Sequence, residues 1–373
     1  MSKEYTCLGM MSGTSGDGVD ASIIRSNGLN ELTILRDKYY EYDEKLFHNF
    51  HNLKKKINST KDIKNFSSSI KELEKNITLF HAKIVQDISG GINLDLIGFH
   101  GQTLYHNPQE KISLQLGNGN LLSQLSKKKI VFNFRKNDIQ HGGEGAPLTP
   151  IFHKYLLKAE KIDLPACILN IGGISNITLM SNINDSQIFS RDVGPGNCLI
   201  DSWIQNNSDK KFDTEGKISS RGKVNEIILE QALETHENNF QKNNNISLDT
   251  NDFDISFARG LNLEDGAATL TAFTAKIIAS KIGFILKEFE KKNIKIIICG
   301  GGRKNTSLIN QIKLNSRKNL SFLISEDFNL NGDFIESRAF GYIAIRSVLS
   351  LPISFPTTTG CSAPCSGGEI IQP

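Results

Sequence analysis

Three short apolar stretches, bounded by turn-forming residues, open the chain. They cover residues 5–10, 19–26 and 32–42, and each has the length and composition of a β-strand. The loop between the first two, residues 12–18, contains three glycines. The chain is therefore predicted to begin with a glycine-rich hairpin that extends into a three-stranded meander.

Apolar residues then recur at alternating steps of three and four from Ile63 to Ile88, and the pattern stops at Gly90-Gly91. This spacing predicts one long amphipathic helix. Strands at 94–99, 112–116 and 130–134 and a helix at 121–126 follow. Strands and helices that alternate in this way are typical of an α/β lobe.

The second half of the chain repeats this plan. Strands at 166–171 and 174–180 flank the turn Gly172-Gly173, and a third strand is expected at 187–192. The remaining predicted elements are helices at 197–205, 223–235, 264–290, 306–312 and 334–349 and strands at 295–299 and 320–324. The Asn- and Lys-rich stretches 206–217 and 237–245 are expected to be solvated connections.

The 373 residues are too many for one ordinary core, at roughly 150 residues per domain. We therefore expect a duplicated two-lobe α/β fold with mixed sheets and a central cleft. The predicted N-terminal lobe is 1–133, joined by the C-terminal segment 344–373, and the predicted C-terminal lobe is 134–343.

Composition and charge narrow the class of protein. A net charge of +3 gives no basic field for nucleic acid or an anionic membrane. With 38% hydrophobic and 22% charged residues, the chain resembles soluble globular proteins. The N-terminus has no signal-peptide pattern, and no run approaches the roughly 18 apolar residues of a membrane span. A cytoplasmic location fits best.

Six cysteines are scattered along the chain, which favours reduced thiols over a disulfide framework. Only Cys361 and Cys365 are close, at a spacing of C-x3-C. No second Cys or His pair lies near them in the sequence, so the spacing favours an ordinary cysteine pair over a zinc site.

Three glycine-rich turns each follow a predicted strand: residues 13–18, Gly172-Gly173 and 300–302. Turns without side chains let successive backbone N–H groups converge on an anion such as a polyphosphate. Neither a P-loop pattern nor a dinucleotide-binding pattern is present. Equivalent positions in both lobes favour phosphate binding over simple hairpin geometry.

The first loop also carries side chains suited to phosphate and metal. Thr14 and Ser15 have hydroxyl donors, and the carboxylate of Asp17 or Asp20 could hold Mg²⁺ or its waters beside a bound phosphate. Each of these residues is also a good turn former.

The segment 9–20, GMMSGTSGDGVD, resembles the signature of the anhydro-N-acetylmuramic acid kinase family, within the superfamily of sugar kinases, Hsp70 and actin. Further matching segments are GFHGQTLYH (98–106), FRKND (134–138), GGEGAPLTP (142–150), NIGGISN (170–176), DVGPGN (192–197) and CGGGRKN (299–305). The resemblance implies an RNase H-like, actin-like ATPase fold in each lobe.

The resemblance also implies an activity. Enzymes of this family open the 1,6-anhydro bond of anhydro-N-acetylmuramic acid with water and phosphorylate O6 from ATP, in cell-wall recycling. It implies a transferase that uses ATP and Mg²⁺, with a homodimer favoured. The implied nucleotide contacts are Gly13, Thr14, Ser15, Gly16, Asp17, Gly18, Val19, Asp20, Gly172 and Gly173 at the phosphates and Gly300, Gly301 and Gly302 beside the adenosine. Asp17 is the expected Mg²⁺ ligand, directly or through water.

The general base implied by the resemblance is Asp192, since the attacking water must lose a proton. The family usually has Thr where this chain has Val193. This departure puts in question a hydrogen bond beside the base, but not the base itself.

The implied sugar contacts lie in two other loops. They are Gln102, Thr103, Gly145, Ala146 and Pro147, and Arg135 could pair with the lactyl carboxylate or form an ordinary salt bridge. For His100 and His106 a packing role competes with a direct one, and Glu336 has no assigned role.

Two other classes of protein would use some of these sequence motifs. A nucleotide-switched binding protein of the actin or Hsp70 type would use the glycine turns without the GQT and GAP segments. A kinase for an ordinary open sugar would use all of them without opening a ring.

Overall fold

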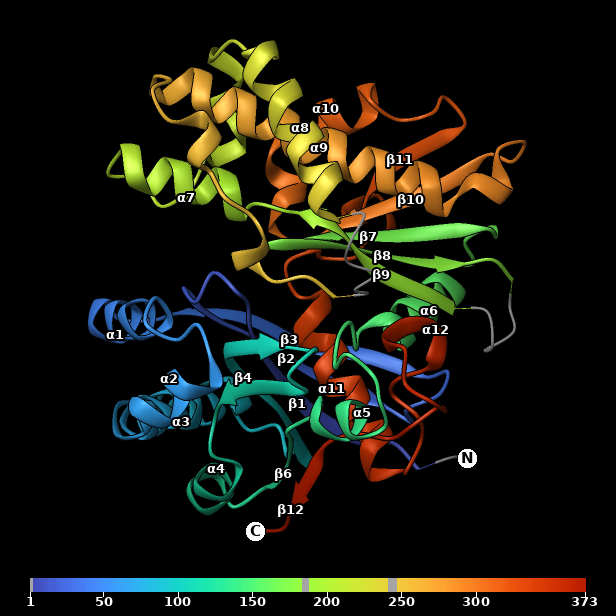
Figure 1. Cartoon of the computed structure of the whole chain (residues 1–373). Helices are drawn as coiled ribbons and strands as arrows, with labels where there is room; N and C mark the ends of the chain where they lie inside the picture. Colours follow the sequence, from blue (N-terminus) through green and yellow to red (C-terminus); the bar gives the residue numbers. More distant parts are fainter. Residues whose placement is uncertain (1–2, 183–187, 241–246) are drawn as a thin grey trace. The chain divides into compact units, whose positions relative to one another are not determined.

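The computed structural model describes residues 3–182, 188–240 and 247–373, and it separates them into two compact units. Unit 1 contains residues 1–161 and 333–373, and unit 2 contains residues 162–332. Figure 1 shows the elements of both.

Unit 1 is built on a mixed sheet. β1 (Tyr5–Ser12), β2 (Gly18–Ser26) and β3 (Leu32–Glu41) form an antiparallel meander. β4 (Leu96–Asn107) pairs parallel to β1, and β6 (Lys129–Phe132) pairs parallel to β4. β12 (Glu369–Ile371) extends the edge at β6, and β5 (Ile112–Leu116) pairs with β4.

Helices cover both faces of this sheet. Alternation along β1 turns Leu8 and Met10 toward α3 (Ser67–Ser89), whose apolar residues share their core. Gly9 faces the opposite way, where a side chain would overlap the backbone of α11 (Ile335–Val348). The other helices of unit 1 are α1 (Glu44–Lys54), α2 (Thr60–Asn65), α4 (Gly119–Ser126), α5 (Lys136–Gln140), α6 (Pro150–Ala159) and α12 (Pro356–Thr359).

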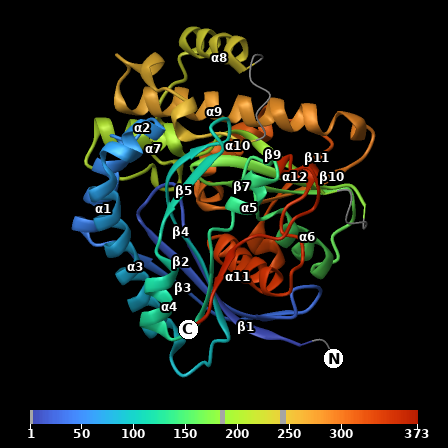
Figure 2. The same cartoon turned by 60° about the horizontal axis from the view of Figure 1, so that its bottom comes forward.

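Unit 2 has the same topology. β7 (Ala166–Ile171), β8 (Ile174–Met180) and β9 (Ile188–Pro195) form the meander, and β10 (Ile294–Cys299) and β11 (Leu320–Ile324) continue the sheet parallel to β7. Its longer helices are α7 (Cys198–Asn207), α8 (Glu226–Phe240), α9 (Leu263–Ile285) and α10 (Thr306–Leu314). Figure 2 shows α9 as one long helix with α8 and α10 beside it.

The strand orders β3-β2-β1-β4-β6 and β9-β8-β7-β10-β11 are the same, so the predicted mixed α/β architecture and its duplication are confirmed. Among the described residues, α9 alone is long and apolar enough to resemble a membrane span. Its apolar residues lie in the core of unit 2, which also contains Trp203 and Ile296.

The unit boundaries differ from the predicted lobes. The structure places residues 134–161 and 333–343 in unit 1, whereas the sequence suggested the C-terminal lobe. Packing explains the difference. Phe340 of α11 lies against His100 of β4, with ring centroids 4.5 Å apart, and the rings of Phe134 and Phe152 lie 5.3 Å from Phe340 and 5.5 Å from Tyr342, respectively.

Several helices also differ from the sequence prediction. The expected helix from Ile63 is interrupted at Phe66, whose ψ of 18° ends α2 before α3 begins. The sequence analysis missed α1, although Asp43 caps its start by accepting the Leu46 N–H. In the predicted connection 237–245, α8 continues to Phe240, and residues 241–245 lie outside the described residues.

Candidate active site

The second and third glycine turns lie together in unit 2. In the parallel ladder Cys299 stands beside Asn170, so β7 and β10 end at one edge of the sheet. Gly172-Gly173 follows β7, and Gly300 follows β10. The carboxyl ends of parallel strands are a common ligand position in α/β proteins. The structure thus brings together two turns that are far apart in sequence.

The turn Gly172-Gly173 is bonded to the segment after β9. The N–H groups of Gly196 and Asn197 donate to the carbonyls of Gly173 and Gly172, at 2.9 and 2.8 Å. A side chain at position 196 would overlap the Gly172 carbonyl, so glycine is needed for this approach. The segment 192–197 therefore shares one edge with the second turn.

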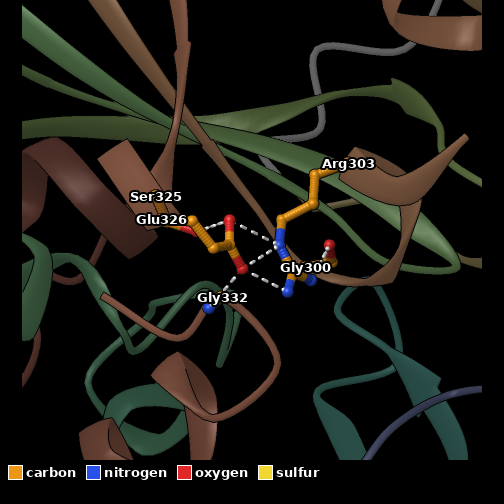
Figure 3. Close-up of polar contacts among 5 residues, drawn as sticks. All are labelled: Gly300, Arg303, Ser325, Glu326 and Gly332. Carbon is orange, nitrogen blue, oxygen red and sulfur yellow. Dashed lines mark hydrogen bonds and ion pairs between the residues drawn. The ribbon is translucent and has the colours of Figure 1, made fainter. Parts of the chain in front are cut away.

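An ion pair holds the third turn (Figure 3). Arg303 is buried, its Nη1 donates to the Gly300 carbonyl at 2.9 Å, and its Nε and Nη2 donate to Glu326 Oε1 at 2.8 and 2.5 Å. Glu326 also accepts from the Ser325 hydroxyl and the Gly332 N–H. Burial raises the pKa of Glu326, but the bonds and charge of Arg303 outweigh this and lower it to about 2. The carboxylate therefore stays ionised at neutral pH.

One residue of the turn at 300–302 has open space around its backbone. Gly300 has a φ of +77°, and a side chain at Gly302 would overlap Ile171. Gly301 is exposed, and the atom nearest to an added side chain there would be Asn197 Nδ2, at 4.0 Å. This edge can accept a ligand without side chains intervening.

Asp192 lies near the end of β9 and is half-buried. Its Oδ2 accepts the Leu248 N–H at 2.7 Å, which fixes the carboxylate. Asn176 of β8 stands directly opposite Asp192 in the ladder, so the two side chains share a face. A buried oxygen of the Asn176 amide has no partner among the described residues.

Val193 is the extra residue of a bulge, because Ser175 pairs with Gly194 while Asn176 pairs with Asp192. Its side chain is buried in the apolar core of unit 2. Valine suits this position, since a threonine hydroxyl would need a hydrogen-bond partner inside the core.

The first glycine turn lies in unit 1. Gly16 has a φ of +62°, and a side chain there would overlap the Phe50 ring of α1. Thr14 and Ser15 are exposed at its tip, whereas Val19 is buried in β2. The loop can therefore present its backbone and the Thr14 hydroxyl to a phosphate.

Asp17 fits the predicted metal role. Its half-buried carboxylate accepts the Ser15 hydroxyl at 2.6 Å. Burial, then the charges of Asp17, Asp20 and Glu41, raise the pKa of Tyr39, so its phenol keeps its proton and bonds to Asp17. A single carboxylate beside phosphate oxygens is the kind of protein ligand that Mg²⁺ uses, with water completing its shell.

Gln102 connects β4 to the first turn. Its side chain is fully buried, its Nε2 donates to the Gly13 carbonyl at 2.8 Å, and its Oε1 accepts the Tyr42 hydroxyl at 3.3 Å. The Tyr42 hydroxyl also lies 3.1 Å from Ser12 Oγ. Both ends of the Gln102 amide are thus used within the protein, and the half-buried Thr103 next to it is the more accessible of the two.

Arg135, His100 and the 145–147 loop form one network. Arg135 Nη1 donates to the Gly145 carbonyl at 2.7 Å, and Nη2 lies 2.9 Å from His100 Nε2. Burial, then the charge of Arg135, hold the pKa of His100 well below its usual value. Neutral His100 donates from Nδ1 to the Gly101 carbonyl, so Nε2 is free to accept from Arg135. His100 thus has a positioning role.

Two further residues with open roles can be placed. His106 Nδ1 lies 2.9 Å from Ser113 Oγ, and burial, then Arg135, lower its pKa to about 3. His106 is therefore neutral. Glu336 is half-buried in the first turn of α11.

The sequence model of the family described as "Anhydro-N-acetylmuramic acid kinase" matches residues 5–373. The chain belongs to the anhydro-N-acetylmuramic acid kinase family. Members of this family are kinases, so the chain is a phosphotransferase that acts on a sugar hydroxyl. The resemblance drawn from the sequence motifs is confirmed.

Two relatives extend over nearly the whole chain. The anhydro-N-acetylmuramic acid kinase of Pelagibacter ubique is 52% identical over 374 residues, which is 100% of both chains. That of Zymomonas mobilis is 37% identical over 371 residues, covering 97% of this chain and 98% of the relative. A solved glucokinase of the ROK family from Streptomyces griseus, in complex with glucose and AMPPNP, aligns with a TM-score of 0.41 and 12% identity, over 90% of this chain and 97% of that one.

The sequence analysis missed several residues that hold the site. Tyr42, Asn176 and Glu326 act through side chains, and Leu248 acts through its N–H. Only Asn176 had a signal, because it lies within the glycine-turn segment 170–176. The others come from segments that carry no motif.

Proposed function

We propose that the protein opens 1,6-anhydro-N-acetylmuramic acid with water and transfers the γ-phosphoryl group of ATP to its O6. A water oxygen bonds to the anomeric carbon while the bond from that carbon to O6 breaks. O6 bonds to the γ-phosphorus as ADP leaves. The products are N-acetylmuramic acid 6-phosphate and ADP, and the water proton goes first to a base and then to solvent.

Asp192 is the proposed base. Its carboxylate is held by the Leu248 N–H, and it lies on the strand that leads into the segment bonded to Gly172-Gly173. A carboxylate fixed in this way could take the proton of the attacking water. This fixed carboxylate beside two glycine turns is the observation that carries the proposal.

The ATP phosphates would contact the backbone and the Thr14 hydroxyl of the first turn and the turn at 172–173, and the turn at 300–302 would flank the adenosine. Mg²⁺ held at Asp17 would neutralise phosphate charge during transfer. Buried Arg303 supports the third turn through the Gly300 carbonyl, so its charge acts on the loop and not on the phosphate.

For the sugar we propose contacts from Thr103, Arg135 and the 145–147 loop. The Arg135 guanidinium is half-buried, and neutral His100 and the Gly145 carbonyl orient it, so the fork could meet a carboxylate such as the lactyl group. Gln102 is fully buried and donates to the Gly13 carbonyl. We therefore propose that it positions the first turn and does not contact the sugar directly.

The substitution Asp192→Asn tests the proposal. We expect sugar-dependent ADP formation to fall by about 10²-fold or more, since the amide cannot accept the proton. Nucleotide should still bind, measured by calorimetry. Asp209→Asn, at an exposed aspartate after α7, is the matched control and should keep activity. Full activity in Asp192→Asn would overturn the assignment.

Two controls separate the alternatives. Turnover of ATP without sugar would indicate a nucleotide-switched binding protein. Reaction in ¹⁸O-labelled water should place the label at C1 of the product, whereas a kinase for an open sugar would incorporate none by transfer.

We further propose that the enzyme acts in the cytoplasm in cell-wall recycling, as a homodimer. The substrate class supports a role in cell-wall recycling, because the anhydro sugar is a peptidoglycan fragment. Gel filtration with light scattering would test the dimer.

A further inference from the structure

A buried group of two thiols and one carboxylate lies in unit 1. Atoms of Asp138, Cys361 and Cys365 all lie within 4.8 Å of one another, and no other such metal-ligating group occurs among the described residues. The exposed fractions of these residues are 1%, 1% and 7%. Asp138 belongs to α5, whereas the cysteines follow α12. The fold therefore adds a third donor that the C-x3-C spacing lacks.

We propose that Asp138, Cys361 and Cys365 form a zinc site. Thiolate and carboxylate ligands bind Zn²⁺ at about 2.3 and 2.0–2.2 Å, which places neighbouring ligand atoms of a tetrahedron roughly 3.5–3.8 Å apart. Cys365 Sγ and Asp138 Oδ1 are 4.0 Å apart, so small side-chain rotations would close the site. Water would take the fourth position.

Surrounding bonds already orient these ligands. Asp138 Oδ1 accepts the Thr359 hydroxyl at 2.6 Å, and Oδ2 accepts the Gly145 N–H at 2.7 Å. Ser354 Oγ lies 3.0 Å from Cys365 Sγ, where its hydroxyl can donate to a thiolate. Partners outside the ligand set commonly fix metal ligands in this way.

The two thiols and one carboxylate form a donor set that suits a soft divalent ion. A soft divalent ion displaces the thiol protons on binding, and paired thiolates select Zn²⁺ over Mg²⁺. Through Asp138 the ion would fasten the C-terminal segment to the 145–147 loop.

Cobalt titration of the reduced, metal-free full chain tests the site. We expect a thiolate-to-cobalt charge-transfer band that saturates near one equivalent and is lost on adding Zn²⁺. The double variant Cys361→Ser/Cys365→Ser should lack the band, and Cys198→Ser, at a half-buried cysteine of unit 2, should keep it. No band in the wild type, or an unchanged band in the double variant, would overturn the proposal.

A second measurement needs no variant. Alkylation at a urea concentration that partly unfolds the chain, followed by peptide mass mapping, should show Cys361 and Cys365 protected by Zn²⁺, with Cys198 labelled equally with and without metal. Zn²⁺ should also raise Tm by several degrees, reversed by a chelator. Equal labelling of Cys361 and Cys365 in both states would contradict the site even if the variants fail to fold.

Discussion

At the scale of single residues, much of the candidate site is held by side chains that do not face a ligand. Glu326 holds Arg303, Gln102 holds Gly13, and His100 orients Arg135. Sequence motifs reveal segments of unusual composition, such as the glycine-rich turns. The residues that hold these turns in place come from segments without a motif, so only the folded structure identifies them.

The contribution of Glu326 to stability should depend on pH. Its pKa is lowered from 4.5 to about 2 in the fold, so its stabilising contribution is present above about 4.5 and is lost as the pH falls toward 2. Glu326→Gln should lower stability by about 1 kcal/mol at pH 7, because buried Arg303 loses its charged partner while the half-exposed carboxylate is screened. Melting curves of both proteins from pH 7 to 3 would measure this.

The difference in Tm between the two proteins should shrink below about pH 4.5. The exposed Glu288 offers a matched control, since Glu288→Gln should melt like the wild type at each pH. A constant difference across the range would show that the charge of Glu326 is not what stabilises the turn.

At the scale of elements, the glycine turns depend on what packs behind them. Gly13 and Gly16 belong to one loop, and the sequence pattern does not distinguish their roles. In the structure Gly16 has a φ of +62° and faces Phe50 of α1, whereas an added side chain at Gly13 meets only Ser15 Oγ at 3.6 Å. Position in the fold, and not residue type, separates their roles.

Gly16→Ala should therefore destabilise unit 1 by about 2–4 kcal/mol, through left-handed strain and overpacking against Phe50. Gly13→Ala should change stability by less than about 0.5 kcal/mol. Urea denaturation followed by circular dichroism would measure both. Equal losses in the two variants would mean that the loop does not take this conformation.

Most elements followed from local patterns, since apolar spacing and glycine turns predicted the strands of both meanders and most helices. The errors have different causes. The cap of α1 at Asp43 was not recognised as a helix signal. The break at Phe66 lies inside a continuous apolar pattern, so spacing alone cannot reveal it.

At the scale of the whole molecule, unit 1 is discontinuous in sequence and unit 2 is continuous. The core of unit 2 contains only residues from 162–332. Unit 1 needs α11, whose backbone approaches Gly9 and Gly98 so closely that neither position could carry a side chain. Unit 2 can therefore form its core from one continuous segment, whereas unit 1 needs two segments of the chain.

The fragment 162–332 should melt cooperatively by itself. The fragment 1–161 should lack a cooperative transition, because one face of its sheet loses α11, and co-expression with 333–373 should restore one. Calorimetry and proton NMR dispersion would show this. A cooperative transition of 1–161 alone would contradict the assignment of α11 to its core.

The sequence by itself determined the family, the duplicated strand plan and the glycine turns, because these depend on local spacing and composition. Only the tertiary structure decided which distant residues meet: Asp192 with Leu248, Arg303 with Glu326, and Asp138 with Cys361 and Cys365. Such contacts depend on strand register and on how α5 and α12 pack, and no local pattern encodes either. The cysteine pair illustrates this, because its third ligand lies more than 200 residues earlier in the chain.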